Sequence, residues 1–193
     1  SQIGNLLKRA GLPVTLRENN NPRNPVPVHR DNVFNQPTDV AWDSKGNSYF
    51  TDGYVNSRVA KVNARGEWVA SWGSLGKGPV QFDTPHGVAV SPKDEIYVAD
   101  RGNRRIQVLD TEGNFLREFT IDVPVDTSRG KITYGVELPN AKTGSQAPGA
   151  PDALCMTPGP NPVLFVGDLY PSRIYKVSLE GKVLGVYGQP GRN

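Results

Sequence analysis

The sequence predicts an all-β chain that forms a β-propeller segment of about three four-stranded blades. Within residues 84–119, four short apolar segments alternate with turn-forming runs of Ser, Pro, Asp, Asn and Gly. Short apolar segments separated in this way are typical of strands joined by tight turns. The pattern occurs two more times along the chain, and a repeated four-stranded meander is the building unit of a propeller.

The repeat is defined by the spacing of recurring landmarks. A proline is followed by an aspartate 15, 15 and 17 positions later; the pairs are Pro37 and Asp52, Pro85 and Asp100, and Pro151 and Asp168. An arginine is followed by a glycine 8 positions later; the pairs are Arg58 and Gly66, Arg105 and Gly113, and Arg173 and Gly181. An aromatic residue then lies 6 positions beyond each glycine: Trp72, Phe119 and Tyr187. Three registers that agree at these landmarks indicate a structural repeat.

Taken in order, the chain is one partial propeller domain with five parts. These are an N-terminal strand remnant and linker (1–35), repeat one (36–73), repeat two (84–120), an inter-blade insertion (121–149) and repeat three (150–188). At the start, a strand at 1–12 is favoured over a short helical arm at 3–10. The insertion contains a predicted strand at 131–138, and we expect either a lid or partner surface there or a merely decorative loop.

Three repeats are too few to close a ring, because propellers commonly need four to eight blades. We therefore expect one of three arrangements: the chain is a piece of a six-bladed protein, two copies complete one ring, or other chains pair with its open edges. The first arrangement is favoured.

Composition narrows the classes of function. The chain has 193 residues and a net charge of +3, with its positive charges scattered, so no nucleic-acid surface is expected. No apolar run approaches the length of a membrane span. The single cysteine, Cys155, lies in an apolar run and is expected to be a buried structural thiol. Phosphate-binding loops, two-histidine zinc motifs and nucleophile elbows are absent from the sequence.

Equivalent positions of successive blades lie on a circle about the propeller axis. The residues directly after the repeat proline should therefore face the axis together; they are Thr38, His86 and Asp152. His86 is the candidate metal ligand, because imidazole commonly binds zinc and catalytic zinc sites often use three protein ligands. An axial histidine that is only hydrogen-bonded to water is the alternative.

Tyr54 and Arg101 follow two of the repeat aspartates and fall near the same end of the ring as His86. Beside a metal ligand they could supply a general base and a fixed cation, so both are candidate catalytic residues. The repeat aspartates and arginines are predicted to be architectural, with each aspartate accepting backbone N–H groups of the turn that follows. His29 lies in a polar connection and is expected to be solvated.

Strings of the chain resemble a known family. The strings at 85–90, 96–101 and 103–108 resemble the NHL repeat. Those at 36–41, 48–54, 56–59 and 85–86 resemble the peptidyl-α-hydroxyglycine α-amidating lyase (peptidylamidoglycolate lyase) family, particularly its bacterial-type members. The resemblance is strong over 36–119 and weaker over 150–188.

The resemblance implies a six-bladed propeller that uses zinc to cleave a peptidyl α-hydroxyglycine, a carbinolamide, into a peptide amide and glyoxylate. It implies that His86 is one of three zinc histidines, that Tyr54 accepts the hydroxyl proton and that Arg101 holds the substrate. The family's other two zinc histidines and its calcium ligands lie outside this chain. Family members are usually exported, so a secreted or periplasmic location is expected.

Two other classes of function stay open. The first is a non-catalytic NHL propeller that binds a protein or a glycan. The second is an assembly unit whose open blade edges pair with a protein partner or with further copies of the chain. The expected partners are thus a small peptide-like substrate, or a protein or second copy, with no nucleic acid and no membrane span.

Overall fold

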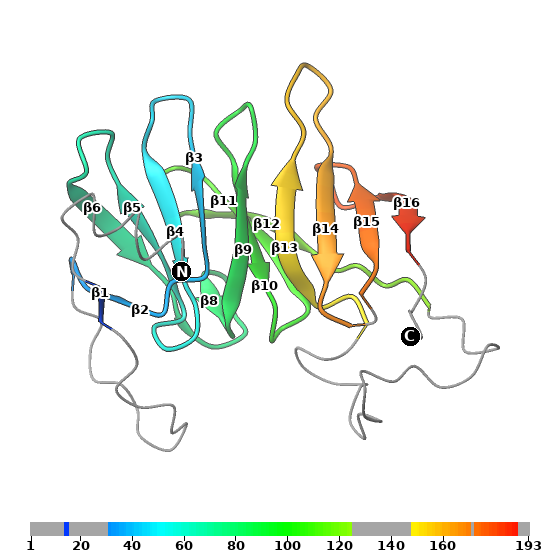
Figure 1. Cartoon of the computed structure of the whole chain (residues 1–193), viewed down its shortest axis with the longest axis horizontal. Coiled ribbons are helices and arrows are strands. Elements are labelled where there is room, and N and C mark those ends of the chain that lie inside the picture. Colours follow the sequence, from blue (N-terminus) through cyan, green and yellow to red (C-terminus); the bar gives the residue numbers. More distant parts are fainter. Residues whose placement is uncertain (1–13, 16–30, 125–147, 171, 189–193) are drawn as a thin grey trace.

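The computed structural model describes residues 14–15, 31–124, 148–170 and 172–188. The described chain forms three four-stranded antiparallel sheets that stand side by side (Figure 1). Neighbouring strands in each sheet follow one another in sequence, as tight turns require. The predicted all-β chain with three four-stranded blades is confirmed. The predicted elements at 1–12 and 131–138, and His29, lie outside the described residues.

The blades have nearly equal strands. Blade one consists of β3 (Asp39–Trp42), β4 (Ser48–Asp52), β5 (Arg58–Val62) and β6 (Trp68–Trp72). Blade two consists of β9 (Pro85–Val90), β10 (Ile96–Asp100), β11 (Arg105–Leu109) and β12 (Phe115–Phe119). Blade three consists of β13 (Pro151–Met156), β14 (Leu164–Asp168), β15 (Ile174–Val177) and β16 (Val183–Tyr187). Two short parallel pairs precede the first two blades: β1 (Val14–Thr15) with β2 (Phe34–Asn35), and β7 (Ser74–Leu75) with β8 (Gln81–Phe82).

The inner strands β3, β9 and β13 are adjacent, and the apolar core lies between the blades. One buried cluster joins blade two to blade three, with Tyr97 and Val108 packed near Val166 and Tyr175. A second cluster joins blade one to blade two through side chains that include Tyr49, Val59, Val88, Ile96 and Val98. Each blade therefore buries one face of its sheet against the next blade.

The glycine and aromatic landmarks of the repeat meet between blades. Gly113 has a φ of 83°, and a Cβ at this position would lie 2.3 Å from the ring of Trp72 in the preceding blade. Gly181 has a φ of 94° and approaches Phe119 in the same way. Only glycine combines this left-handed turn with so close an aromatic contact.

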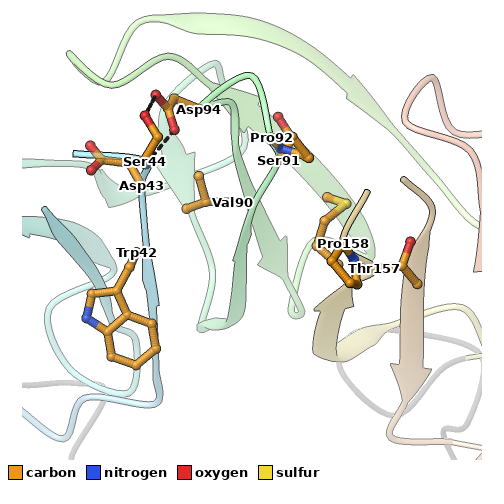
Figure 2. A pocket seen from close by; sticks show the side chains of 10 residues that line it. Trp42, Asp43, Ser44, Val90, Ser91, Pro92, Asp94, Thr157 and Pro158 are labelled. Carbon is orange, nitrogen blue, oxygen red and sulfur yellow. Dashed lines mark hydrogen bonds between the residues drawn. The ribbon is translucent and has the colours of Figure 1, made fainter. Parts of the chain in front are cut away.

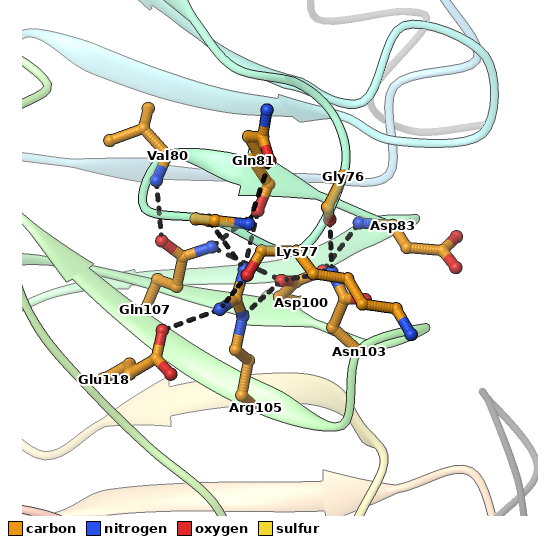
Figure 3. A network of polar contacts seen from close by, with 11 residues as sticks. Gly76, Lys77, Val80, Gln81, Asp83, Asp100, Asn103, Arg105, Gln107 and Glu118 are labelled. Atoms are coloured by element: carbon orange, nitrogen blue, oxygen red, sulfur yellow. Dashed lines mark hydrogen bonds and ion pairs between the residues drawn. The ribbon is translucent and has the colours of Figure 1, made fainter.

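Each repeat aspartate joins the end of the second strand of its blade to the segment that precedes the first strand. Asp100 accepts the main-chain N–H of Asp83 at 2.7 Å and the Nε–H of Arg105 at 2.8 Å (Figure 3). Asp52 and Asp168 accept N–H groups of Asn35 and Gly149 in the same manner. The aspartates also bind the segment that follows, as predicted, but for Asp52 and Asp100 the donor is the side-chain amide of Asn56 or Asn103 in place of the predicted backbone N–H. Asp168 accepts the backbone N–H of Arg173.

The repeat arginines bind main-chain carbonyls of the segment that precedes their blade. Arg105 donates to the carbonyls of Lys77, Gly78 and Gln81 at 2.8–2.9 Å (Figure 3). Arg173 donates to Val123 and Pro124. These buried, charge-assisted bonds hold each entering segment against its blade, which is the architectural role expected from the sequence.

Cys155 is exposed, so its predicted burial was wrong. Side chains alternate along a strand, and Leu154 and Met156 of β13 pack against the core shared with blade two. Cys155 therefore points to the opposite face of blade three, where the cross-strand neighbours Ile174 and Tyr187 are also exposed. In the part of the chain that the structure describes, no helix has the length and apolar character needed to cross a membrane.

Candidate functional site

The candidate residues converge at the end of the blades where the inner strands begin. His86 is the second residue of β9, and Asp152 is the second residue of β13. Tyr54 lies just beyond β4, and Arg101 directly follows β10. In each blade the end of the second strand lies beside the start of the first strand. The repeat therefore brings all four side chains to the same end of the blades.

Two β-bulges aim His86 and Asp152 out of their ladders. On β9, Val88 pairs with Val98 and Pro85 pairs with Asp100, so His86 and Gly87 together oppose one residue. On β13 the pairing also shifts by one residue, at Asp152. Bulges often occur beside active sites because they redirect a side chain.

Tyr54 contacts both His86 and Arg101. The phenol oxygen of Tyr54 lies 3.3 Å from Nε2 of His86, and the two rings meet edge to face. The guanidinium of Arg101 lies 5.5 Å from the centre of the Tyr54 ring, within the range of a cation–π contact. Tyr54 is half exposed, whereas Arg101 is only 8% exposed. The site therefore combines an accessible phenol with a buried cation.

The hydrogen bonds of His86 define its tautomer. Nδ1 lies 3.0 Å from the main-chain oxygen of Asp152, and a carbonyl oxygen can only accept, so Nδ1 carries the proton. Nε2 is then the acceptor for the Tyr54 hydroxyl. Burial lowers the pKa of His86; the carboxylate of Asp152 opposes this effect and the charge of Arg101 adds to it. A neutral imidazole with an unprotonated Nε2 is the form that binds a metal ion, and a metal ion on Nε2 would take the place of the Tyr54 hydrogen bond.

Glycine at position 53 allows the close approach of Tyr54 and His86. A Cβ at Gly53 would lie 1.9 Å from the carbonyl oxygen of Pro85. Tyr54 and His86 are the next residues after these two, so the contact between Gly53 and Pro85 sets the distance between the functional side chains. This gives a physical reason for the Asp-Gly-Tyr string at 52–54.

Thr38, the third residue predicted to face the axis, binds the main chain and Thr51 and not the side chains of the candidate site. The hydroxyl of Thr38 donates to the carbonyl of Pro85 at 3.0 Å and lies 2.9 Å from the hydroxyl of Thr51. Thr51, which the sequence did not single out, donates to the carbonyl of His86 at 2.7 Å. Both threonines thus support the main chain around His86. The sequence feature that could have identified Thr51 is its position directly before the repeat aspartate Asp52.

His86 fits one position of a metal site by its donor chemistry. Among the described residues, however, no three His, Cys, Asp or Glu side chains gather to hold a metal ion. The nearest carboxylate, that of Asp152, accepts Nη1–H of Arg101 at 2.7 Å. The described residues therefore do not complete a zinc or calcium site, and both metals stay predictions.

A cavity of about 300 Å³ lies at the opposite end of the inner strands (Figure 2). Its lining includes Trp42, Val90 and Met156, the last residues of β3, β9 and β13. The carboxylate of Asp94 at its rim already accepts the N–H and hydroxyl of Ser44. The cavity is thus separate from the candidate site, and its rim carboxylate is engaged in joining two blades.

Comparison with known families supports the repeat. Residues 82–109 match the NHL repeat model. The first three strands of the middle blade thus resemble an NHL repeat. The matched segment includes two of the candidate residues, His86 and Arg101.

Curated relatives extend the similarity. The chain is 42% identical over 103 residues to peptidylglycine α-amidating monooxygenase of Rattus norvegicus, covering 50% of this chain and 11% of that protein. It is 26% identical over 183 residues to a probable peptidyl-α-hydroxyglycine α-amidating lyase of Caenorhabditis elegans, covering 80% of this chain and 52% of that protein. The resemblance to amidating lyases is confirmed. The chain spans about half of the nematode protein and a smaller part of the rat protein.

Solved structures support the fold. Virginiamycin B lyase from Staphylococcus aureus matches 81% of this chain with a TM-score of 0.53, and the match covers 42% of that chain. Sequence identity is 17%, so this likeness shows the propeller fold alone.

Proposed function

We propose that this NHL propeller acts in a lyase that cleaves N-acyl α-hydroxyglycines into an amide and glyoxylate. The observation that carries the proposal is the 3.3 Å approach of the Tyr54 hydroxyl to Nε2 of His86, with the Arg101 guanidinium stacked beside the same phenol. The similarity to a probable peptidyl-α-hydroxyglycine α-amidating lyase supports the substrate class.

The reaction breaks the O–H and C–N bonds of the carbinolamide. The electron pair of the O–H bond becomes the second bond of the glyoxylate aldehyde. The pair of the C–N bond moves to the amide nitrogen, which receives one proton. Atoms balance without water or a redox partner, so the protein must supply only positioning, proton transfer and charge stabilisation.

The residues of this chain suit these tasks. The phenol of Tyr54 passes its own proton to the departing nitrogen while its oxygen accepts the proton of the substrate hydroxyl, so the side chain is the same before and after the reaction. Arg101 holds the carboxylate of the substrate: its Nη1–H is bound to Asp152, but its buried Nε–H has no acceptor among the described residues. A planar guanidinium with an unused donor is a fitting partner for a carboxylate.

His86 is proposed to be one ligand of a catalytic zinc ion, with the other ligands supplied from outside the described residues, in a ring of six blades. A bound zinc ion supplies Lewis-acid polarisation of the substrate hydroxyl. The contribution of this chain is a neutral imidazole whose orientation is fixed by its Nδ1–H bond.

Glyoxylate release from N-acetyl-α-hydroxyglycine tests the proposal, measured for the whole protein and for Tyr54→Phe. We expect the variant to lose roughly 10²- to 10⁴-fold in kcat, the usual contribution of a positioned proton-transfer group. Tyr187→Phe is the matched control, because Tyr187 is exposed to the same degree and lies on the outermost strand of blade three. Full activity of Tyr54→Phe would remove the proposed base, and an inactive wild-type protein would remove the lyase assignment.

A second candidate function is a scaffold that binds a protein partner or a second copy. It is favoured by the open face of blade three, where the cross-strand neighbours Ile174 and Tyr187 are 48% and 50% exposed. Contiguous exposed apolar side chains on a sheet commonly mark an interaction surface. Sedimentation analysis tests this candidate: concentration-dependent assembly that Ile174→Lys abolishes supports it, and a monomer at all concentrations contradicts it.

A further inference from the structure

Asp152 connects two of the candidate residues through two different groups. Its main-chain oxygen lies 3.0 Å from Nδ1 of His86. Its carboxylate Oδ1 accepts Nη1–H of Arg101 at 2.7 Å and lies 3.4 Å from the same Nδ1. One residue of blade three thus contacts an imidazole and a guanidinium that both belong to blade two.

The main-chain contact determines which nitrogen of His86 faces the site. Because the carbonyl accepts Nδ1–H, the ring cannot rotate without losing this bond, and Nε2 stays directed towards Tyr54. A second acceptor on the far nitrogen is the usual means of orienting a ligating histidine. This function belongs to the backbone and does not depend on the side chain at position 152.

The carboxylate contact determines the position of Arg101. Arg101 is 8% exposed and its guanidinium stacks on the exposed ring of Tyr54, so it needs a counter-charge close by. Asp152 provides it at 2.7 Å through a single nitrogen, Nη1. The ion pair engages Nη1, whereas the buried Nε–H has no acceptor among the described residues.

Two local features of the structure place Asp152 beside His86 and Arg101. The register shift on β13 occurs at Asp152 and turns it out of the ladder. Gly87 permits the adjacent strands to approach, since a Cβ at that position would lie 2.8 Å from the Asp152 carbonyl oxygen. The contact is therefore built into the geometry of two neighbouring blades.

We propose that Asp152 is a positioning residue of the site: its carbonyl holds His86 in the Nδ1–H tautomer, and its carboxylate anchors Arg101. The consequence for catalysis rests on the proposed function, but the two contacts can be measured without turnover. A residue from blade three then sets the geometry of a site whose reactive groups lie in blades one and two.

Three variants of the whole protein test this inference. Asp152→Ala removes the carboxylate and keeps the carbonyl, and Asp152→Asn keeps an acceptor oxygen but removes the charge. Asp122→Ala is the control, because Asp122 is exposed. Nitrogen-15 NMR of the histidine ring and of the arginine side chains provides the readouts that do not require activity.

We expect His86 to be the Nδ1–H tautomer in the wild type, in Asp152→Ala and in Asp122→Ala. The side-chain N–H resonances of Arg101 should shift in Asp152→Ala, shift less in Asp152→Asn and stay unchanged in Asp122→Ala. The KM for N-acetyl-α-hydroxyglycine should rise roughly tenfold or more in Asp152→Ala, with partial rescue in Asp152→Asn, because the anchor of the carboxylate-binding arginine is lost.

An Nε2–H tautomer in the wild type, or Arg101 resonances and KM unchanged in Asp152→Ala, would overturn the inference. If the wild type releases no glyoxylate, the proposed function fails by itself, and the two NMR readouts alone decide the role of Asp152. A loss of stability without a change in KM or in the Arg101 resonances would reduce Asp152 to a structural residue.

Discussion

Replacing Gly53 by alanine tests how the repeat positions the candidate site. The new Cβ would lie 1.9 Å from the carbonyl oxygen of Pro85, whereas ordinary contact begins at 3.4 Å. The end of β4 and the start of β9 must therefore separate by about 1.5 Å. Tyr54 and His86 directly follow the two clashing residues, so their 3.3 Å contact should lengthen beyond hydrogen-bond range.

Two effects of different size should result. Overpacking of this kind destabilises a protein by about 1–3 kcal/mol, which urea unfolding can measure. A misplacement of about 1 Å between reacting groups costs activity on the order of 10²-fold. Glyoxylate release should therefore fall far more than the loss of folded protein explains.

Gly167→Ala is the matched control for this prediction. The nearest described neighbour of a Cβ at Gly167 is the Cβ of Ala153 at 3.7 Å, an ordinary contact, so stability and activity should stay near wild type. If the two variants unfold at the same urea concentration and are equally active, the close approach at Gly53 does not position the site.

Two further predictions concern the buried polar groups. Asp100→Ala should cost about 3–5 kcal/mol of unfolding free energy, because Arg105 loses its fully buried carboxylate partner and the main-chain N–H of Asp83 loses its acceptor. Asp110→Ala, whose bonds lie in an exposed turn, should cost about 1 kcal/mol; equal losses in urea unfolding would contradict burial as the cause. Burial raises the pKa of Tyr49, Tyr97 and Tyr175 above the ordinary value of 10.0. Their contribution is complete below about pH 10 and is lost as the pH rises further, by up to about 1.4 kcal/mol per pH unit for each tyrosine. A urea midpoint that stays constant above about pH 10 would contradict this.

The blades could be predicted because their landmarks are contacts between repeats. Gly113 recurs at its spacing because it turns beneath Trp72 of the preceding blade, and Asp100 recurs because it ties the entering segment to the second strand. The partner of Asp100 could not be predicted, since the entering segment lies close in space but 17 residues earlier in the chain. Burial of Cys155 was wrong because an apolar run does not reveal which strand face has a neighbour.

The sequence predicted where the candidate residues lie in the fold, but not which atoms they contact. The ring placed His86 and Asp152 at one end of the axis, and the structure brings them to 3.0 Å. The same reasoning gave Thr38 an equal place, but its short side chain binds the main chain of the neighbouring strand instead. The bulges that redirect His86 and Asp152 depend on strand pairing, which spacing alone does not encode.

An experimental structure of the whole protein, crystallised with zinc and examined by anomalous scattering, tests the central claim most directly. Zinc is expected about 2.0–2.1 Å from Nε2 of His86. Nδ1 should stay bonded to the Asp152 carbonyl, and Tyr54 and Arg101 should lie beside the metal. A zinc ion bound elsewhere, or a His86 ring with Nε2 turned away from Tyr54, would contradict the proposed site.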